Sequence, residues 1–220
     1  MTQHANQLKQ HIETPYTATE ELMNSVTHGL GVVLSIIGLI ALIYDAINTD
    51  NLIKLISVSV YGSSLIVLFL ASTVYHFVTK PRLKSTFKLL DHCAIYLLIA
   101  GSYTPLMLVT LKGSVGYAML GIVWGLAILG IGFKVVFGTR YKVISLATYL
   151  IMGFISVFII NKLFQTLPFE GMSLLVAGGA IYTIGVYFYV KKSIPFNHAI
   201  WHLLVLAAAA CHFALIYHYV

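Results

Sequence analysis

Seven long apolar stretches, separated by short polar breaks, constrain this chain more than any other feature of its sequence. A helix needs about 20 residues to cross the hydrocarbon core of a bilayer, and each stretch is long enough to do so. The sequence therefore predicts an all-α fold: a polytopic membrane protein built as a seven-transmembrane-helix bundle. The stretches are residues 24–47, 52–78, 88–111, 114–137, 142–162, 170–190 and 197–219.

Charged residues are too few to cover a water-soluble protein of this size. Only 9% of the 220 residues are charged and 59% are hydrophobic, whereas soluble domains carry about 25% charged residues. The net charge of +6 comes mainly from Lys and Arg in or near the breaks between the apolar stretches, which indicates membrane topology. We expect the lipid bilayer to surround the chain and expect no nucleic acid as a partner.

The sequence divides into a polar N-terminal tail, residues 1–22, and a single seven-helix domain, residues 23–220. The tail lacks the basic, apolar and small-residue segments of a signal peptide. Either Thr19 or Asn24 is expected to cap the first helix, since both residue types favour the N-cap position. Both cysteines lie inside apolar stretches, so they are expected to be buried thiols rather than a disulfide.

The basic residues also predict the direction in which the helices cross the membrane. Short breaks make successive helices antiparallel, so the tail and the second, fourth and sixth breaks lie on one side. Ten Lys and Arg residues lie on or near that side and three on the other. The positive-inside rule then places the N-terminus in the cytoplasm and the C-terminus outside.

Six polar residues interrupt the ends of the apolar stretches. An ionisable or polar side chain at membrane depth is costly unless it is partnered, so such residues are candidates for a functional site. The predicted topology brings these side chains, from four separate helices, to one depth near the cytoplasmic face. They are His28, Ser72, His76, Asp91, His198 and His202.

The spacing of the histidines indicates a metal site. His198 and His202 are four residues apart and share one helix face, so both imidazoles can bind one ion. His76 from a facing helix completes a three-histidine set, which leaves a fourth position for water and is typical of catalytic Zn²⁺. Asp91 is expected to exchange protons with that water or to orient a histidine. Ser72 is expected to donate to a substrate oxygen or to hold Asp91.

Four polar residues receive no assigned role from the sequence: His28 from the set above, and Asn24, His92 and His212 in addition. Asn24 and His28 have the same four-residue spacing, but hydrogen bonds between helices explain them equally well. His92 is expected to pack or to lie at the interface, because it faces about 100° away from its neighbour in the helix. His212 lies halfway along the last stretch or beyond, and it is left out of the site.

The polar residues lie in sequence blocks that resemble those of the haemolysin III proteins, the bacterial branch of the progestin and adipoQ receptor family. The resemblance extends over essentially all seven apolar stretches. The blocks are Asn24-Ser-Val-Thr-His28-Gly29, Ser72-Thr-Val-Tyr-His76, Asp91-His-Cys-Ala-Ile95, Ala100-Gly-Ser-Tyr-Thr-Pro105 and His198-Ala-Ile-Trp-His202.

The resemblance implies a bacterial plasma-membrane protein with a zinc ion near the cytoplasmic face. It implies that His76, His198 and His202 bind the metal, with Asp91 reaching it through water and Ser72 close by. The same pattern occurs in alkaline ceramidases, which hydrolyse lipid amides, and bacterial members are linked to membrane-lipid homeostasis.

The resulting prediction is a zinc-dependent hydrolase of lipid amide or ester bonds, with a membrane lipid as its substrate. The alternative is a non-enzymatic membrane effector that acts in cytolysis or lipid sensing, with a structural zinc ion and a membrane lipid as ligand. No specific substrate and no oligomeric state are predicted.

Overall fold

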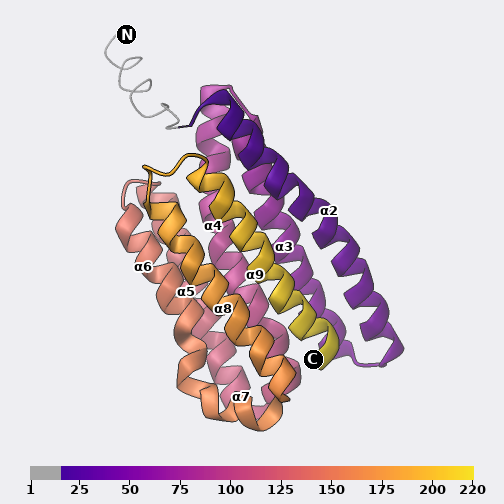
Figure 1. Cartoon of the computed structure of the whole chain (residues 1–220). Coiled ribbons are helices and arrows are strands. Elements are labelled where there is room, and N and C mark those ends of the chain that lie inside the picture. The colour runs from indigo at the N-terminus through magenta and orange to yellow at the C-terminus, as the bar shows by residue number, and fades with distance from the viewer. Residues whose placement is uncertain (1–15) are drawn as a thin grey trace.

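Helices make up nearly all of the chain described by the computed structural model, which covers residues 16–220. In a bilayer a helix satisfies its backbone polar groups within its own segment, and the described residues contain no strand. The seven predicted spans are confirmed and pack side by side in one bundle (Figure 1). They are Ala18–Asn48 (α2), Leu52–Phe77 (α3), Pro81–Leu111, Gly113–Phe137 (α5), Lys142–Thr166, Phe169–Val190 (α8) and Asn197–Tyr219 (α9).

The first helix begins within the segment predicted to be a polar tail. The Thr17 hydroxyl accepts a hydrogen bond from the Glu20 amide at 3.2 Å, and the Glu20 carboxylate accepts one from the Thr17 amide at 2.8 Å. This reciprocal capping box satisfies two amides at the helix start. The expectation that Thr19 or Asn24 caps the helix was therefore wrong, because both lie inside it. Residues 1–15 of the predicted tail lie outside the described part of the chain.

The third span changes its helical form near its end because of a proline. Pro105 has no amide hydrogen to give to the preceding turn, and proline inside a helix disturbs the regular hydrogen bonding. The α-helix α4 (Pro81–Pro105) is followed directly by the π-helix η1 (Leu106–Leu111). The span therefore continues to its end with a wider turn rather than stopping at the proline.

The fifth span is interrupted, although the sequence suggested one continuous helix. The Tyr103 hydroxyl of α4 donates to the Gly153 carbonyl at 2.9 Å and accepts from the Ser156 amide at 2.9 Å. One side chain thus satisfies backbone groups on both sides of the irregular turn. The span consists of α6 (Lys142–Phe154), the 3-10 helix η2 (Ile155–Ile159) and α7 (Ile160–Thr166).

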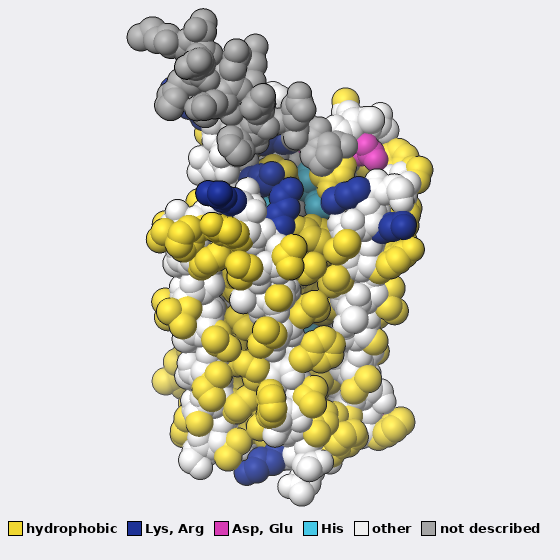
Figure 2. Space-filling view, turned by 90° about the vertical axis from the view of Figure 1, so that its left-hand side faces the viewer, with side chains coloured by type: hydrophobic (Ala, Val, Ile, Leu, Met, Phe, Trp, Pro, Cys, Tyr) yellow, Lys and Arg dark blue, Asp and Glu magenta, His cyan; other side chains and the backbone are white. Residues whose placement is uncertain are grey.

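The helices enclose two apolar clusters. One lies among α4, η1, α5 and the interrupted fifth span, and the other among α2, α3, α4 and α9. The outer wall of the bundle is also apolar, as expected for a surface that faces lipid (Figure 2). We call the end of the bundle at which α2, α4, α6 and α9 begin the N-terminal end. The candidate site lies at this end, above the second cluster.

Candidate metal centre

Three buried histidines from two helices meet at the N-terminal end of the bundle. One nitrogen atom from each of His76, His198 and His202 lies within 4.8 Å of the other two. His198 and His202 are one turn apart at the start of α9, and their ring centroids are 4.5 Å apart. His76 lies in the last turn of α3, with its ring centroid 5.0 Å from each of the other two. The residues that the sequence predicted as ligands therefore lie together.

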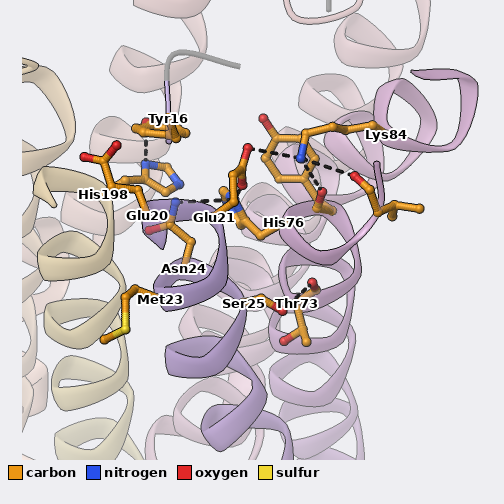
Figure 3. Close-up of polar contacts among 12 residues, drawn as sticks. Tyr16, Glu20, Glu21, Met23, Asn24, Ser25, Thr73, His76, Lys84 and His198 are labelled. Carbon is orange, nitrogen blue, oxygen red and sulfur yellow. Dashed lines mark hydrogen bonds and ion pairs between the residues drawn. The ribbon is translucent and has the colours of Figure 1, made fainter. Parts of the chain in front are cut away.

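Each of the three imidazoles has one hydrogen-bonded nitrogen and one without a partner. All three Nε2 atoms are buried and form no hydrogen bond. Leaving a buried polar atom unpaired costs about 1–3 kcal/mol, and each of the three clustered histidines has one such atom. Nδ1 of His76 contacts the Glu21 carboxylate at 2.6 Å, and Nδ1 of His198 contacts the Tyr16 hydroxyl at 3.0 Å (Figure 3). Nδ1 of His202 contacts the Asn24 carbonyl at 3.0 Å.

This pattern fits a metal ion. A neutral imidazole that donates through Nδ1–H offers the lone pair of Nε2 to a metal, and the partner of Nδ1 fixes the orientation of the ring. Three histidine nitrogens are donors that metal ions such as Zn²⁺ accept in proteins. The described residues can therefore hold a metal ion, and the three unpaired nitrogens are the structural reason.

Glu21 links the first of these histidines to a buried lysine. Its second carboxylate oxygen lies 3.1 Å from Nζ of Lys84 on α4. The same ammonium group donates to the carbonyls of Tyr75, at 3.1 Å, and Val78, at 3.3 Å, where α3 ends. A cation at a helix C-terminus is favourable because the last carbonyls carry partial negative charge. These contacts of Glu21 and Lys84 connect α2, α3 and α4 beside His76.

The Tyr16 hydroxyl lies between His198 and Lys192 of the α8–α9 connection. Nζ of Lys192 donates to this hydroxyl at 2.9 Å and lies 5.0 Å from the ring centroid of Tyr189. Burial, together with the nearby Tyr189 and the carboxylates of Glu21 and Glu20, raises the pKa of Tyr16 above its usual value. The phenol therefore keeps its proton at neutral pH. Its oxygen has two lone pairs, so it can accept from both Lys192 and the imidazole.

Sequence reasoning missed Tyr16, Glu21 and Lys84 as parts of the site. The first two were assigned to a polar tail, which hid their relation to the helix. Once the helix begins at Ala18, the spacing of Glu21, Asn24 and His28 places all three on one helix face. That spacing was the signal available for Glu21. Tyr16 precedes the helix and follows no periodic pattern, so no comparable signal existed for it.

Asp91 and Ser72 are buried, but they do not belong to the mutually close set. Their exposed fractions are 5% and 0%. Ser72 lies one turn before His76 on the same face of α3, and its hydroxyl has no hydrogen-bond partner of normal geometry. Among the described residues, the ligand atoms that lie within 4.8 Å of one another come from the histidines and not from Asp91. Ser72 lies within hydrogen-bonding reach of Asp91, so a buried hydroxyl and a buried carboxyl group adjoin each other one helical turn from His76.

Asn24 and His28 also belong to this buried polar group. The His28 ring stacks on that of His202, with centroids 3.5 Å apart and planes 11° apart. Both of its nitrogens are buried without a hydrogen-bond partner. The Asn24 side-chain amide lies 3.5 Å from Nδ1 of His76. The Asn24 contact joins α2 to α3, which agrees with the hydrogen bonds between helices considered for this pair, whereas His28 contacts α9 by stacking.

The remaining two histidines make contacts that account for them structurally. Nδ1 of His92 lies 2.6 Å from the Lys88 carbonyl one turn earlier, which agrees with the packing role expected for it. Nε2 of His212 lies 3.4 Å from the Leu175 carbonyl on α8, so it bridges two helices. Both side chains lie apart from the three convergent nitrogens.

Comparisons with known proteins agree with this architecture over nearly the whole chain. A family model described as Haemolysin-III related matches residues 16–213. Hemolysin-3 of Bacillus cereus is 45% identical over 201 residues, which cover 91% of this chain and 92% of the relative. The Hemolysin-3 homolog of Bacillus subtilis (strain 168) is 43% identical over 198 residues, covering 90% and 93%. Monocyte to macrophage differentiation factor of Homo sapiens is 35% identical over 209 residues, covering 92% and 85%.

Proposed function

This chain belongs to the haemolysin III family, and we propose that it is a zinc-dependent hydrolase of lipid amide or ester bonds with a role in membrane-lipid homeostasis. It is a multi-pass bacterial membrane protein, so lipid is the substrate that reaches its interior most directly. The single observation that carries the proposal is the meeting of three buried histidines, each of which has an unpaired Nε2 atom.

The histidines would bind the ion through Nε2, and their Nδ1 contacts would keep the rings in place. When bound, zinc lowers the pKa of a water molecule to about 7 and polarises a carbonyl oxygen. Asp91 is the candidate general base and acid: its carboxylate takes a proton from the attacking water and returns it to the leaving group. Ser72 would donate a hydrogen bond to the substrate oxygen or hold Asp91, with which it lies in hydrogen-bonding reach.

Turnover of lipids by the purified protein tests this function. A panel of lipid amides and esters is incubated with the protein, with the protein after chelation, and with the chelated protein after zinc is restored. We expect hydrolysis that disappears on chelation and returns with zinc. Asp91→Asn should abolish turnover while the metal content stays near that of the wild type. An absence of metal-dependent turnover across the whole panel would refute the hydrolase.

One observation favours a second function, a non-enzymatic effector in which the metal is structural. The three histidines are no more than 7% exposed, and the start of α2 covers them. Glu20 accepts a hydrogen bond from the Phe196 amide at 3.2 Å, which joins this helix start to the α8–α9 connection. In this case His76→Ala would lower the unfolding temperature, and no hydrolytic rate would be lost.

The orientation of the bundle forms part of the same proposal. The excess of Lys and Arg at the N-terminal end supports a cytoplasmic location for this end. A single cysteine placed at exposed Lys191 in a variant lacking Cys93 and Cys211 should react with a membrane-impermeant thiol reagent only after the cells are opened. Reaction in intact cells would reverse the assignment and place the candidate centre near the outer face.

A further inference from the structure

Positive charge far exceeds negative charge at the N-terminal end of the bundle. Among the described residues, the carboxylates at this end are Glu20, Glu21 and Asp91. Figure 2 shows Lys and Arg side chains in a band at this end, with histidine side chains visible between them. The cations are Lys80, Arg82, Lys84, Lys88, Lys134, Arg140, Lys142, Lys191 and Lys192.

Three of these cations approach the candidate centre from three different elements. Lys88 is half-buried on α4, three residues before Asp91 and hence on nearly the same helix face. Lys192 is held beside His198 through the Tyr16 hydroxyl. Lys142 begins α6, which packs against both α4 and α8. The three lysines also influence one another electrostatically, so they lie near one another at this end of the bundle.

The three lysines have no carboxylate partner in the part of the chain that the structure describes. The lysine ion pairs found there use Lys54 and Lys84. Burial and the charges of Lys142 and Lys88 lower the pKa of Lys192, which is the effect of like charges held near one another. Below them Lys134 is fully buried, and its ammonium group has no hydrogen-bond acceptor. An anion placed among these groups would relieve their mutual repulsion.

The surroundings of the lysines favour a lipid as the source of that anion. Leu90, Val143 and Ile144 lie within two residues of Lys88 or Lys142 on the same helices, and they are 47%, 82% and 49% exposed. Exposed apolar side chains on a transmembrane bundle face acyl chains. An anion that meets the lysines along this wall is therefore attached to a hydrophobic tail. Lysine is also a common partner of phosphate groups.

We propose that Lys88, Lys142 and Lys192 bind the phosphate of an anionic phospholipid headgroup beside the candidate metal centre. The bound lipid then has its acyl ester carbonyls close to Asp91 and the three histidines. Anionic phospholipids would then be the substrate class, and this part of the proposal rests on the proposed hydrolase. The binding itself needs no catalysis and can be measured without it.

The test compares two variants that lose the same charge at the same end of the bundle. Binding of a fluorescent phosphatidylglycerol is measured for the purified protein in phosphatidylcholine nanodiscs, with unlabelled phosphatidylcholine, phosphatidylglycerol, glycerol phosphate and inorganic phosphate as competitors. Metal content and unfolding temperature are measured on the same samples. The first variant combines Lys88→Gln, Lys142→Gln and Lys192→Gln, and the matched control combines Lys80→Gln, Arg82→Gln and Lys191→Gln.

Because Lys88, Lys142 and Lys192 would contact the phosphate directly, each should contribute about fivefold to binding, and we expect the first variant to bind at least about tenfold more weakly. The control variant should lose less than about threefold, and only phosphatidylglycerol should compete. Equal losses in the two variants, or competition by inorganic phosphate alone, would overturn the proposal.

Two single substitutions test the site with less effect on folding and without changing the contact between Lys192 and Tyr16. Lys88→Gln and Lys142→Gln each leave Lys192 and Tyr16 unchanged, and each should weaken binding by about fivefold with normal metal content. Unchanged binding in both would contradict the site. Since lipid binding is measured without turnover, an inactive protein that still binds the lipid would refute the hydrolase alone.

Discussion

Two regions of the bundle differ in whether their polar groups are hydrogen-bonded. At the break between α6 and α7, the Tyr103 hydroxyl satisfies both the Gly153 carbonyl and the Ser156 amide. At the candidate centre, the Nε2 atoms of three histidines, both nitrogens of His28 and the Ser72 hydroxyl stay unpaired. Buried polar groups are normally hydrogen-bonded. In the first region a side chain provides the hydrogen bonds that the irregular backbone lacks. In the second region the unpaired atoms indicate a binding site for a ligand.

The largest expected effect is on metal content, and it separates the two regions directly. His76→Ala, His198→Ala and His202→Ala each remove one of three nitrogen donors, and each should reduce bound zinc from about one ion per chain to less than about a tenth. Elemental analysis of the purified variants measures this. If all three variants kept near-stoichiometric zinc, the unpaired nitrogens would have another explanation.

The next largest effect is expected from a change at Glu21, which orients a ligand histidine and does not bind the metal itself. Glu21→Gln leaves His76 with a neutral partner, and we expect metal affinity to fall by about 10- to 100-fold, as for other groups that orient a ligand histidine. Competition with a zinc-binding dye measures the affinity. Glu20→Gln is the matched control, because that carboxylate caps the helix and contacts the Phe196 amide. Equal loss in both variants would argue against the positioning role.

At the helix break the expected change is in stability alone. Tyr103→Phe keeps the ring but leaves the Gly153 carbonyl and the Ser156 amide without their partner. We expect the free energy of unfolding to fall by about 1–3 kcal/mol, with metal content unchanged. Unfolding in detergent monitored by circular dichroism gives the first quantity. Loss of zinc in this variant would show that the two regions are coupled.

The smallest effect should come from Tyr16→Phe. The phenol oxygen contacts His198 and Lys192, but this position lies near the end of the bundle, where water can replace it. We therefore expect metal affinity to fall by less than about tenfold, in contrast to Glu21→Gln. The same dye competition measures it, and a loss as large as that of a ligand variant would mean that Tyr16 does more than orient a ring.

The sequence predicted the features that depend on local periodicity. Apolar length predicted seven spans, and the four-residue spacing of His198 and His202 predicted that they share a helix face. It could not predict contacts between distant segments, such as that between Tyr16 and His198, which are 182 residues apart. The break after Phe154 was also hidden, because its stabilising partner, Tyr103, comes from another helix. Glu21 is an intermediate case, because its spacing from Asn24 and His28 indicates a shared helix face only once the start of the helix is known.

The three histidines come from α3 and α9, and their Nδ1 partners come from α2 and the residue just before it. The site therefore joins the first, second and last spans of the bundle. During synthesis, a chain that ends before α9 offers a single one of the three imidazoles. Binding of a metal ion by all three histidines would therefore require α9 to be inserted, so an occupied centre would mark a chain in which α9 has joined α2 and α3.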